Sequence, residues 1–482
     1  MAERVVIIGG SIAGLGAAIG LAQEGFPVTV VERELGPDTD DGDEAFQSWD
    51  RRHVPQFRQG HIFQARARNV LHQHAAEVVE LLANDGIETV NFFKLLAPPE
   101  LWTPADDDFD SLLTRRPAFE LALRRVAEAE PGVVFRCPAS AADLLFVDGE
   151  IVTVRGVRLD DGSELPAEVV LDCSGRRTSV PRWLARAGAS ITEDSQDCGI
   201  TYFSRYFRLA PGSAMPMFAI LGVNQEIPKA MQVIGFPGDK GAFGVCLAPR
   251  AGDEELRVLR HNWAWEAAAN AVPAVHAWIG PLNAFPITDV EVMTGHRNIR
   301  HHYVNDGEPL VLGLLAVGDS LCTTNPTYGW GASMALTYAF SAVEALTAHP
   351  GDLRGAALAY EESVAPEADA VYRESAAMDR ARIYRWEGLE VPDGDREEVE
   401  RQDLIGRGVG YGATRDPVLG RAFLRRSNLL DRPDAVLDDP EVVARATAMR
   451  TRLEERTAER PGPTREDILA AIAAAGAPIA EV

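Results

Sequence analysis

The chain has 482 residues, 46% of them hydrophobic, and 47 basic against 72 acidic side chains give it a formal net charge of −25 at pH 7. This length and composition predict about two or three domains with a large buried core. The excess of negative charge argues against nucleic acid as a partner, and since the sequence has no run of about 18 apolar residues we predict no membrane span.

The first 33 residues alternate apolar runs with a glycine-rich turn. Apolar runs at 5–8 and 28–31 predict two buried strands, and the stretch at 15–22 predicts a helix between them. The turn Gly9-Gly10-Ser11-Ile12-Ala13-Gly14 joins the first strand to this helix. Strand, glycine turn, helix and strand in this order are typical of a dinucleotide-binding unit.

Each position of this turn has a physical task in dinucleotide binding. Gly9 permits the tight turn, the small side chain of Ser11 lets the backbone approach a pyrophosphate, and Gly14 lets the helix pack closely. Ser11 replaces the middle glycine of the usual G-x-G-x-x-G pattern. Glu32 ends the second strand beside Arg33, where a carboxylate can accept hydrogen bonds from the hydroxyls of an adenosine ribose.

The next hundred residues or so mix a loop, two helices and a β-rich segment. Residues 37–50 are polar and acidic and predict a surface loop, whereas residues 62–84 predict a helix. Another helix is expected after Thr114, its N-cap candidate, with Pro117 in its first turn. Residues 133–171 are rich in β-type runs.

The character of the sequence changes at 190–295. Short β-type runs stand at 201–209, 217–223, 231–236 and 242–247, and a helix is expected around 253–270. This pattern predicts a separate sheet inserted between two halves of the nucleotide-binding domain.

The remaining residues return to the first pattern and then become helical. A buried strand at 310–317 precedes Gly318-Asp319, and a long helix is expected after the glycines at 329–331. Further helices are expected at 353–380, at 434–460, and from Thr464 as N-cap candidate through Ala474.

Three separated elements carry a resemblance to a known family. They are the glycine turn at 9–14, the stretch Asp172-Cys173-Ser174-Gly175-Arg176, and Gly318-Asp319 followed by Asn325-Pro326-Thr327-Tyr328-Gly329-Trp330-Gly331. Together they resemble the FAD-dependent monooxygenases with the para-hydroxybenzoate hydroxylase fold, which include the single-component aromatic hydroxylases. The stretch Val54-Pro55-Gln56-Phe57-Arg58-Gln59-Gly60-His61 is similar to one in a branch that contains polyketide epoxidases. The resemblance covers roughly residues 1–375.

The resemblance implies roles for individual residues. Asp319 would accept a hydrogen bond from the ribityl chain of FAD, Pro326 would lie against the flavin ring, and Arg116 would lie near the phosphates or the ribityl chain. A helix that begins near Gly331 would stabilise negative charge on the reduced ring. The predicted cofactor contacts are Gly9, Ser11, Gly14, Glu32, Arg33, Arg58, Gln59, Arg116, Gly318, Asp319, Pro326, Gly329 and Gly331.

A substrate pocket is expected beside the flavin. Its predicted residues are Tyr202, Arg205, Tyr328 and Trp330. Tyr202 and Arg205 stand on a strand with alternating side chains in the inserted sheet. Phe203 and Phe207 of the same strand either line the pocket or belong to the core, and the sequence leaves both interpretations open.

The predicted fold class is therefore α/β. A discontinuous Rossmann-like FAD-binding domain comprises residues 1–189 and 296–375, an inserted substrate-binding sheet comprises residues 190–295, and a helical C-terminal region comprises residues 376–482.

The predicted function is that of an FAD-dependent monooxygenase. The resemblance implies that one oxygen atom of O2 is transferred from a flavin C4a-hydroperoxide to a hydrophobic organic substrate, by aromatic hydroxylation or alkene epoxidation. The flavin carries this chemistry, so we expect no catalytic triad. Electrons would come from transiently bound NAD(P)H or from a partner flavin reductase. Two alternatives stay open: a reductase or dehydrogenase acting on C=C bonds, and a flavin-binding protein without turnover.

Cysteines and histidines add little chemistry. The five cysteines form no C-x-x-C pair and the first strand follows almost directly after Met1, so we expect no disulfides and a cytoplasmic location. The pairs His72/His74 and His301/His302 have no carboxylate or cysteine at ligand spacing, and no metal site is expected.

Overall fold

A computed structural model describes residues 3–147, 149–214, 224–227, 229–459 and 462–476. The predicted N-terminal unit is confirmed: β1 (Val5–Ile8), α1 (Ile12–Gln23) and β2 (Val28–Val31) follow one another, and β1 pairs with β2 in parallel. The expected strand at 217–223 lies outside the described residues.

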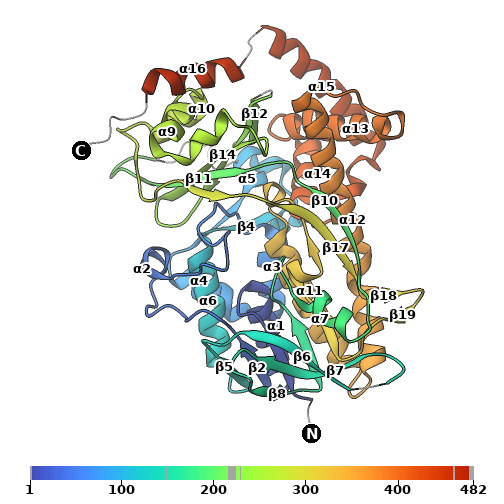
Figure 1. Ribbon diagram of the computed structural model, residues 1–482. Helices are drawn as coiled ribbons and strands as arrows, with labels where there is room; N and C mark the ends of the chain where they lie inside the picture. The colour runs from blue at the N-terminus through green and yellow to red at the C-terminus, as the bar shows by residue number, and fades with distance from the viewer. Residues whose placement is uncertain (1–2, 148, 215–223, 228, 460–461, 477–482) are drawn as a thin grey trace.

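A five-stranded parallel sheet forms the base of the molecule (Figure 1). Its order is β20-β9-β1-β2-β5, with β5 at Val133–Arg136, β9 at Val169–Asp172 and β20 at Leu314–Ala316. The central strand β1 is covered on both faces, so it is a continuous apolar run with all four residues buried.

Helix α1 lies between the sheet and a long helix, α11 (Gly331–Ala348), and it also contacts α6 (Arg116–Ala129). Its small residues permit this close packing. A Cβ atom on Gly20 would lie 2.9 Å from Cγ2 of Val343 in α11.

The inserted sheet lies above this base and is antiparallel (Figure 1). Its strands are β11 (Tyr202–Leu209), β12 (Asn224–Ile227), β13 (Met231–Pro237), β14 (Ala242–Pro249), β15 (Ala284–Pro286) and β16 (Glu291–Met293). Helices α9 (Asn262–Asn270) and α10 (Pro273–Ile279) share one apolar core with it. The single helix expected around 253–270 is instead a 3-10 helix at Leu256–Arg260 followed by α9.

Smaller sheets connect these parts. Three-stranded sheets are formed by β6 (Ala141–Val147), β7 (Thr153–Leu159) and β8 (Glu164–Pro166), and by β10 (Thr192–Asp197), β17 (Arg297–His302) and β21 (Cys322–Thr323). Two-stranded sheets are formed by β3 (Glu88–Asn91) with β4 (Asp110–Leu113), and by β18 (Val304–Asn305) with β19 (Glu308–Pro309). The short helices α2 (Gly42–Ser48), α5 (Phe92–Leu96) and α7 (Val180–Arg186) stand in connections.

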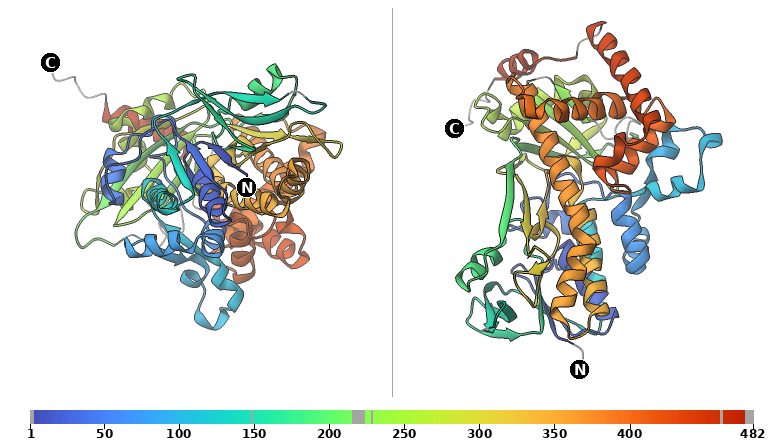
Figure 2. Two further views of the ribbon diagram at one scale, coloured as in Figure 1. Left: turned by 90° about the horizontal axis from the view of Figure 1, so that it is seen from below. Right: turned by 90° about the vertical axis from the view of Figure 1, so that its right-hand side faces the viewer.

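The C-terminal region packs against both layers. Helix α12 (Leu353–Glu387) runs along the whole side of the molecule (Figure 2), so the boundary expected at 375/376 falls inside one continuous helix. The region continues through α13 (Arg396–Asp403), a π-helix (Leu404–Gly410), α14 (Pro417–Ser427), α15 (Pro440–Glu459) and α16 (Arg465–Ala475). Ile468 and Ile472 of α16 join the core of the inserted sheet.

Several expected boundaries are wrong. The helix expected at 62–84 is broken at Ala75 into α3 (Ala65–His74) and α4 (Ala76–Asn84). Thr114 does not cap α6, since Arg115 holds the N-cap position. Of the strand expected at 310–317, only β20 forms. In contrast, Thr464 caps α16 as predicted, in a reciprocal pair with Asp467.

Candidate functional site

A cavity of about 480 Å³ lies where the carboxyl ends of the parallel strands face the inserted sheet. Ser11 follows β1, Ser174 follows β9 and Asp319 follows β20, and all three residues line it. The crevice beyond the carboxyl ends of the strands is where open α/β sheets bind ligands.

The N-terminus of α1 points into this cavity. Ser11 holds its N-cap position, but no side chain of the described residues makes a capping hydrogen bond to the first N–H groups of the helix. The backbone of Gly9 has φ +104°, and a Cβ on Gly14 would lie 1.9 Å from the carbonyl oxygen of Gly9, so glycine is required at both positions. The free N–H groups and the helix dipole together form an anion site.

A second helix N-terminus faces the same cavity. Helix α11 begins after Gly329, whose φ is +72°, and no side chain caps it at Trp330. Pro326, Gly329, Trp330 and Gly331 all line the cavity. The two helix ends give one cavity two positive poles.

Two acceptors at the cavity have no donor among the described residues. The carboxylate of Asp319 receives no hydrogen bond there, and burial raises the pKa of Asp319 although Arg116 and Arg176 oppose the shift. The Oε1 atom of Gln64 is buried and unpaired, while its Nε2 donates to the carbonyl of Tyr328 at 3.1 Å. Both acceptors are therefore free for a ligand that carries N–H or O–H groups.

Arg116 and Ser11 share a buried carboxylate that the sequence analysis did not single out. Arg116 Nε donates to Glu120 Oε1 at 2.5 Å, and Ser11 Oγ donates to the same oxygen at 2.8 Å. Burial would raise the pKa of Glu120, but the charges of Arg116 and Arg51 lower it. Arg116 lies beside the α1 N-terminus, where its Nη2 donates to Ser11 Oγ at 3.0 Å and Glu120 balances its charge.

Glu32 does not face the cavity. Its carboxylate accepts from the N–H of Gly10 at 2.8 Å and of Glu34 at 2.9 Å, and it pairs with Arg51 at 3.2 Å. Arg51 also pairs with Glu34 at 3.0 Å and Glu120 at 3.4 Å. The sequence analysis missed Arg51 because it follows the loop at 37–50, which we expected to lie on the surface.

The other predicted cofactor contacts divide into two groups. Gln59 lines the cavity, and Gly318 places the turn after β20 against Ala13 with φ +68°. Arg33 is exposed, and Arg58 donates to the carbonyls of Gln47 and Trp49; neither side chain lines the cavity.

Strand β11 presents alternate residues to two environments. Tyr202 and Ser204 line the cavity, whereas Phe203 and Phe207 belong to the core formed with α9 and α10. Arg205 shares that opposite face, where it donates to the carbonyl of Thr288 at 2.8 Å and pairs with Glu266. The expectation that Arg205 lines the pocket is therefore wrong, and the open question about the two phenylalanines is settled in favour of the core.

The far wall of the cavity comes from segments that the sequence analysis left without a role. Phe92 and Phe93 of α5 and Phe423 and Leu424 of α14 line it. Trp330 connects this wall to the α11 N-terminus, because its Nε1 donates to the carbonyl of Ser427 at 3.2 Å. No short motif marks these residues, so only the folded chain identifies them.

A positively charged corner completes the lining. Arg176, Arg177 and His296 lie there, and Arg176 hydrogen-bonds His296 Nδ1. Burial and these two arginines lower the pKa of His296 to about 3, so its ring is neutral. Among the described residues neither arginine has a carboxylate within 4 Å.

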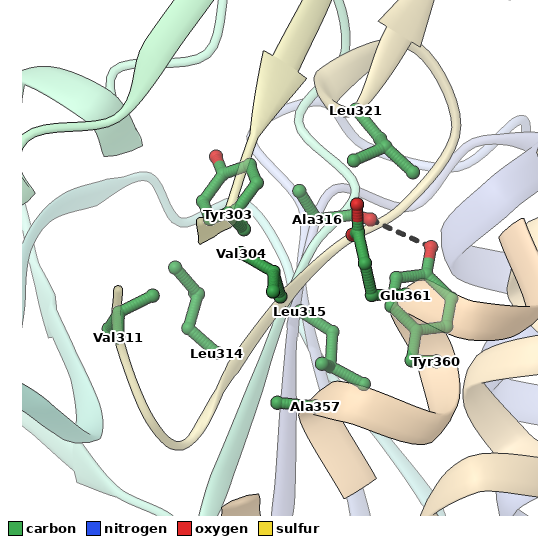
Figure 3. Close-up of a pocket in the computed structure, with 10 residues that line it drawn as sticks. All are labelled: Tyr303, Val304, Val311, Leu314, Leu315, Ala316, Leu321, Ala357, Tyr360 and Glu361. Carbon is green, nitrogen blue, oxygen red and sulfur yellow. Dashed lines mark hydrogen bonds between the residues drawn. The ribbon is translucent and has the colours of Figure 1, made fainter. Parts of the chain in front are cut away.

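A second cavity, beneath β20 and α12, is only about 10 Å³ (Figure 3). This volume holds at most about one water molecule. Tyr360 donates to the carbonyl of Ala316 at 2.8 Å across it. It is a packing defect of the core rather than a binding site.

Other sites are not indicated. All five cysteines are free, and burial raises the pKa of the Cys322 thiol to about 12. In the described ranges, no group of three or more His, Cys, Asp or Glu side chains is arranged to hold a metal ion. No described helix has both the length and the apolar character that crossing a membrane requires.

Solved structures with a similar fold include two flavin-dependent proteins. The flavin-dependent brominase Bmp2 is 17% identical with a TM-score of 0.57, over 95% of this chain and 100% of that one. PqsL, described as a probable FAD-dependent monooxygenase from Pseudomonas aeruginosa, is 17% identical with a TM-score of 0.55, over 83% and 99%. The chain shares their fold.

A third similar structure is 2-methyl-3-hydroxypyridine-5-carboxylic acid oxygenase, which is 15% identical with a TM-score of 0.51, over 83% of this chain and 96% of that one. No protein-family model and no curated protein matches the sequence. At these identities the likeness concerns the fold, so function depends on the site itself.

Proposed function

We propose that the protein is an FAD-dependent monooxygenase that transfers one oxygen atom from O2 to a hydrophobic organic substrate. One observation carries the proposal. A single cavity contains two uncapped helix N-termini and an unpartnered carboxylate at one end, and it continues into an apolar chamber under the inserted sheet.

The residues of the first end fit FAD. The α1 N-terminus and Arg116 would hold the pyrophosphate, and Asp319 would accept from the ribityl hydroxyls. The α11 N-terminus at Gly331 would stabilise negative charge on the reduced ring, with Pro326 against the ring. Bound FAD would supply the activation of O2 and the oxygen transfer.

The protein's own contribution is to bind, orient and exclude water. Phe93, Phe236, Met293 and Leu424 surround the chamber, and such a lining favours an organic substrate of low polarity. We propose that residues 1–189 and 296–375 hold the cofactor, that residues 190–295 form the roof, and that residues 376–482 complete the wall.

The solved structures make this substrate class reasonable. One structure of PqsL is a complex with 2-aminobenzoylacetate, a small aromatic compound. For this chain, aromatic hydroxylation and alkene epoxidation both suit the chamber. Electrons would come from NAD(P)H directly or from a partner flavin reductase.

The first experiment tests cofactor binding. The purified protein should take up FAD in a one-to-one ratio and become yellow. A folded protein that takes up no FAD when it is offered would contradict the proposal.

The second experiment tests oxygen transfer. The FAD-loaded protein, supplied with NADPH and a flavin reductase under ¹⁸O2, is incubated with a panel of phenols and polyenes. One ¹⁸O atom in a product supports the proposal. Saturation of a C=C bond without label would instead assign the protein to the reductases.

A further inference from the structure

A buried hydrogen-bond cluster lies directly behind the loop 325–328 that lines the cavity. At its centre is Asp379 of α12, whose side chain is fully buried. Its Oδ2 accepts from Asn298 Nδ2 at 2.8 Å. Its Oδ1 accepts from Asn325 Nδ2 at 2.6 Å and from the Tyr328 hydroxyl at 2.9 Å. Arg382 Nη1 lies 2.8 Å from the same oxygen and balances the charge.

Asn325 transmits the orientation of this carboxylate to the cavity. A carboxylate only accepts hydrogen bonds, so the Nδ2 side of Asn325 must face Asp379. Its Oδ1 is then turned toward the loop, where it accepts from the N–H of Thr327 at 2.9 Å and from the hydroxyl of Tyr202. The turn Pro326–Tyr328 is thus capped by an amide whose direction Asp379 fixes.

Asn298 secures the same loop from its other side. Its Nδ2 faces Asp379, and its Oδ1 accepts from the backbone N–H of Asn325 at 2.9 Å and from Ser375 Oγ at 2.6 Å. Both asparagines therefore take their orientation from one carboxylate. The cluster joins β17, the loop at 325–328 and α12, three segments far apart in the sequence.

The cluster also orients two tyrosines of the cavity wall. Tyr328 donates its hydrogen to Asp379, and Tyr202 donates its hydrogen to Asn325. Thr327 Oγ1 lies 2.7 Å from the Tyr202 hydroxyl and can donate to it. Both tyrosines line the cavity, so the cluster fixes the position of their side chains there.

We propose that Asp379 is a positioning residue that fixes the loop 325–328 and the side chains of Tyr202 and Tyr328 in place beside the bound cofactor and substrate. This proposal rests on the proposed function, because the loop would lie against the flavin. Asp379 acts through Asn325, Asn298 and Tyr328 and does not itself line the cavity.

The variant Asp379→Asn changes the hydrogen-bond pattern of the cluster while the size of the side chain stays the same. An amide at position 379 has one acceptor edge and one donor edge. Its donor edge must face a group that donates to Asp379 in the wild type, so Asn298, Asn325 or Tyr328 must turn away. The second substitution, Asn298→Asp, places a carboxylate at the other end of the hydrogen bond between positions 298 and 379. The carboxylate at 298 can accept from the new amide, from the N–H of Asn325 and from Ser375, so N298D/D379N should restore the pattern.

A matched control lies outside this cluster. Asp106 is buried and accepts from Arg421 Nε at 2.8 Å and from the N–H of Thr103 at 2.7 Å, and none of these three residues lines the cavity. Asp106→Asn should lower thermal stability as D379N does. It should leave the environment of the flavin unchanged.

The test uses the full chain loaded with FAD. We expect D379N to shift the visible absorption bands and the midpoint potential of the flavin, N298D/D379N to return both toward wild type, and D106N to alter neither. Unchanged flavin properties in D379N, or equal changes in D106N, would overturn the proposal. Should D379N not fold, Tyr328→Phe, which removes one bond to Asp379, must shift the same bands by a smaller amount.

A measurement without FAD keeps the two proposals distinguishable. Hydrogen exchange of the FAD-free protein should be faster by about tenfold or more at the Thr327 amide in D379N, because its acceptor is turned away. Wild-type protein that binds no FAD would refute the proposed function alone. Equal exchange at Thr327 in D379N and wild type would refute the role of Asp379.

Discussion

Arg51 lies against Glu32 beside the glycine turn at 9–14, with Nη2 3.2 Å from Oε2 and side chains only 1% and 5% exposed. The same guanidinium also pairs with Glu34 and with Glu120, whose side chain is fully buried. One cation from a loop therefore contacts three carboxylates around the glycine turn, and Arg116 shares only Glu120 with it. Without Arg51, those carboxylates would repel one another beside the turn that we propose binds a pyrophosphate.

Arg51→Ala should destabilise the protein strongly. Breaking a buried ion pair by removing one partner costs about 3–5 kcal/mol, since the other charge stays buried and unpaired. Urea denaturation would measure the loss of unfolding free energy. The matched control is Arg52→Ala, because Arg52 is 83% exposed and pairs with Asp50 on the surface. A loss below about 1 kcal/mol in R51A, the range of a surface pair, would contradict the buried network.

The sequence predicted those parts of the site that depend on residues close together along the chain. The strand, glycine turn and helix at 5–23 form from local propensity and hydrophobic pattern, so their positions followed from the sequence. Asp319 was singled out because Gly318-Asp319 follows a buried strand and resembles a motif of the flavin monooxygenases. Such features need no knowledge of the rest of the fold.

Contacts between distant segments could not be predicted in the same way. Arg51 reaches Glu120 from 69 residues away, and Phe423 reaches the cavity from a helix with no motif. Arg205 was misplaced because it stands three residues from Tyr202, and side chains that alternate along a strand put these two residues on opposite faces. The packing of α9 on the inserted sheet decides which of the two faces belongs to the core.

Asp319→Asn should weaken the binding of FAD but stabilise the FAD-free protein. The carboxylate of Asp319 has no donor in the described structure and burial raises its pKa, so removing its charge should raise the melting temperature of the FAD-free protein. FAD should bind about 10–100-fold more weakly, since a hydrogen bond to a charged group contributes about 1.5–3 kcal/mol. Fluorescence titration with FAD and thermal unfolding would measure the two effects.

Asp50→Asn is the control for this change, because Asp50 is exposed and does not line the cavity. Neither quantity should change measurably in D50N. If D319N bound FAD as tightly as wild type, Asp319 would have no part in holding the cofactor.

Gly14→Ala should disrupt the glycine turn. A Cβ at this position would lie 1.9 Å from the backbone oxygen of Gly9, which cannot move without unfolding the turn. Forcing such a contact costs about 3 kcal/mol or more. Gly16→Ala in the same helix is the matched control: its Cβ would lie 3.1 Å from the mobile end of Leu336, and alanine gains about 1 kcal/mol of helix propensity. Equal stability of the two variants would contradict the described turn.

Acid should destabilise the protein through His296. Burial and the nearby charges of Arg176 and Arg177 lower the pKa of His296 from 6.5 to about 3 in the folded state. Between these values the unfolded chain binds a proton that the folded chain does not, so stability falls as the pH falls. The loss of unfolding free energy between pH 7 and pH 5 should be about 2 kcal/mol for this one group.

In His296→Gln the pH dependence of the unfolding free energy should weaken by that amount, measured by urea denaturation at each pH. His72→Gln, on an exposed position of α3, should leave the dependence as it is in wild type. A wild-type slope in H296Q would mean that the ring of His296 takes up its proton equally in both states, and hence that the arginine-lined corner does not enclose it.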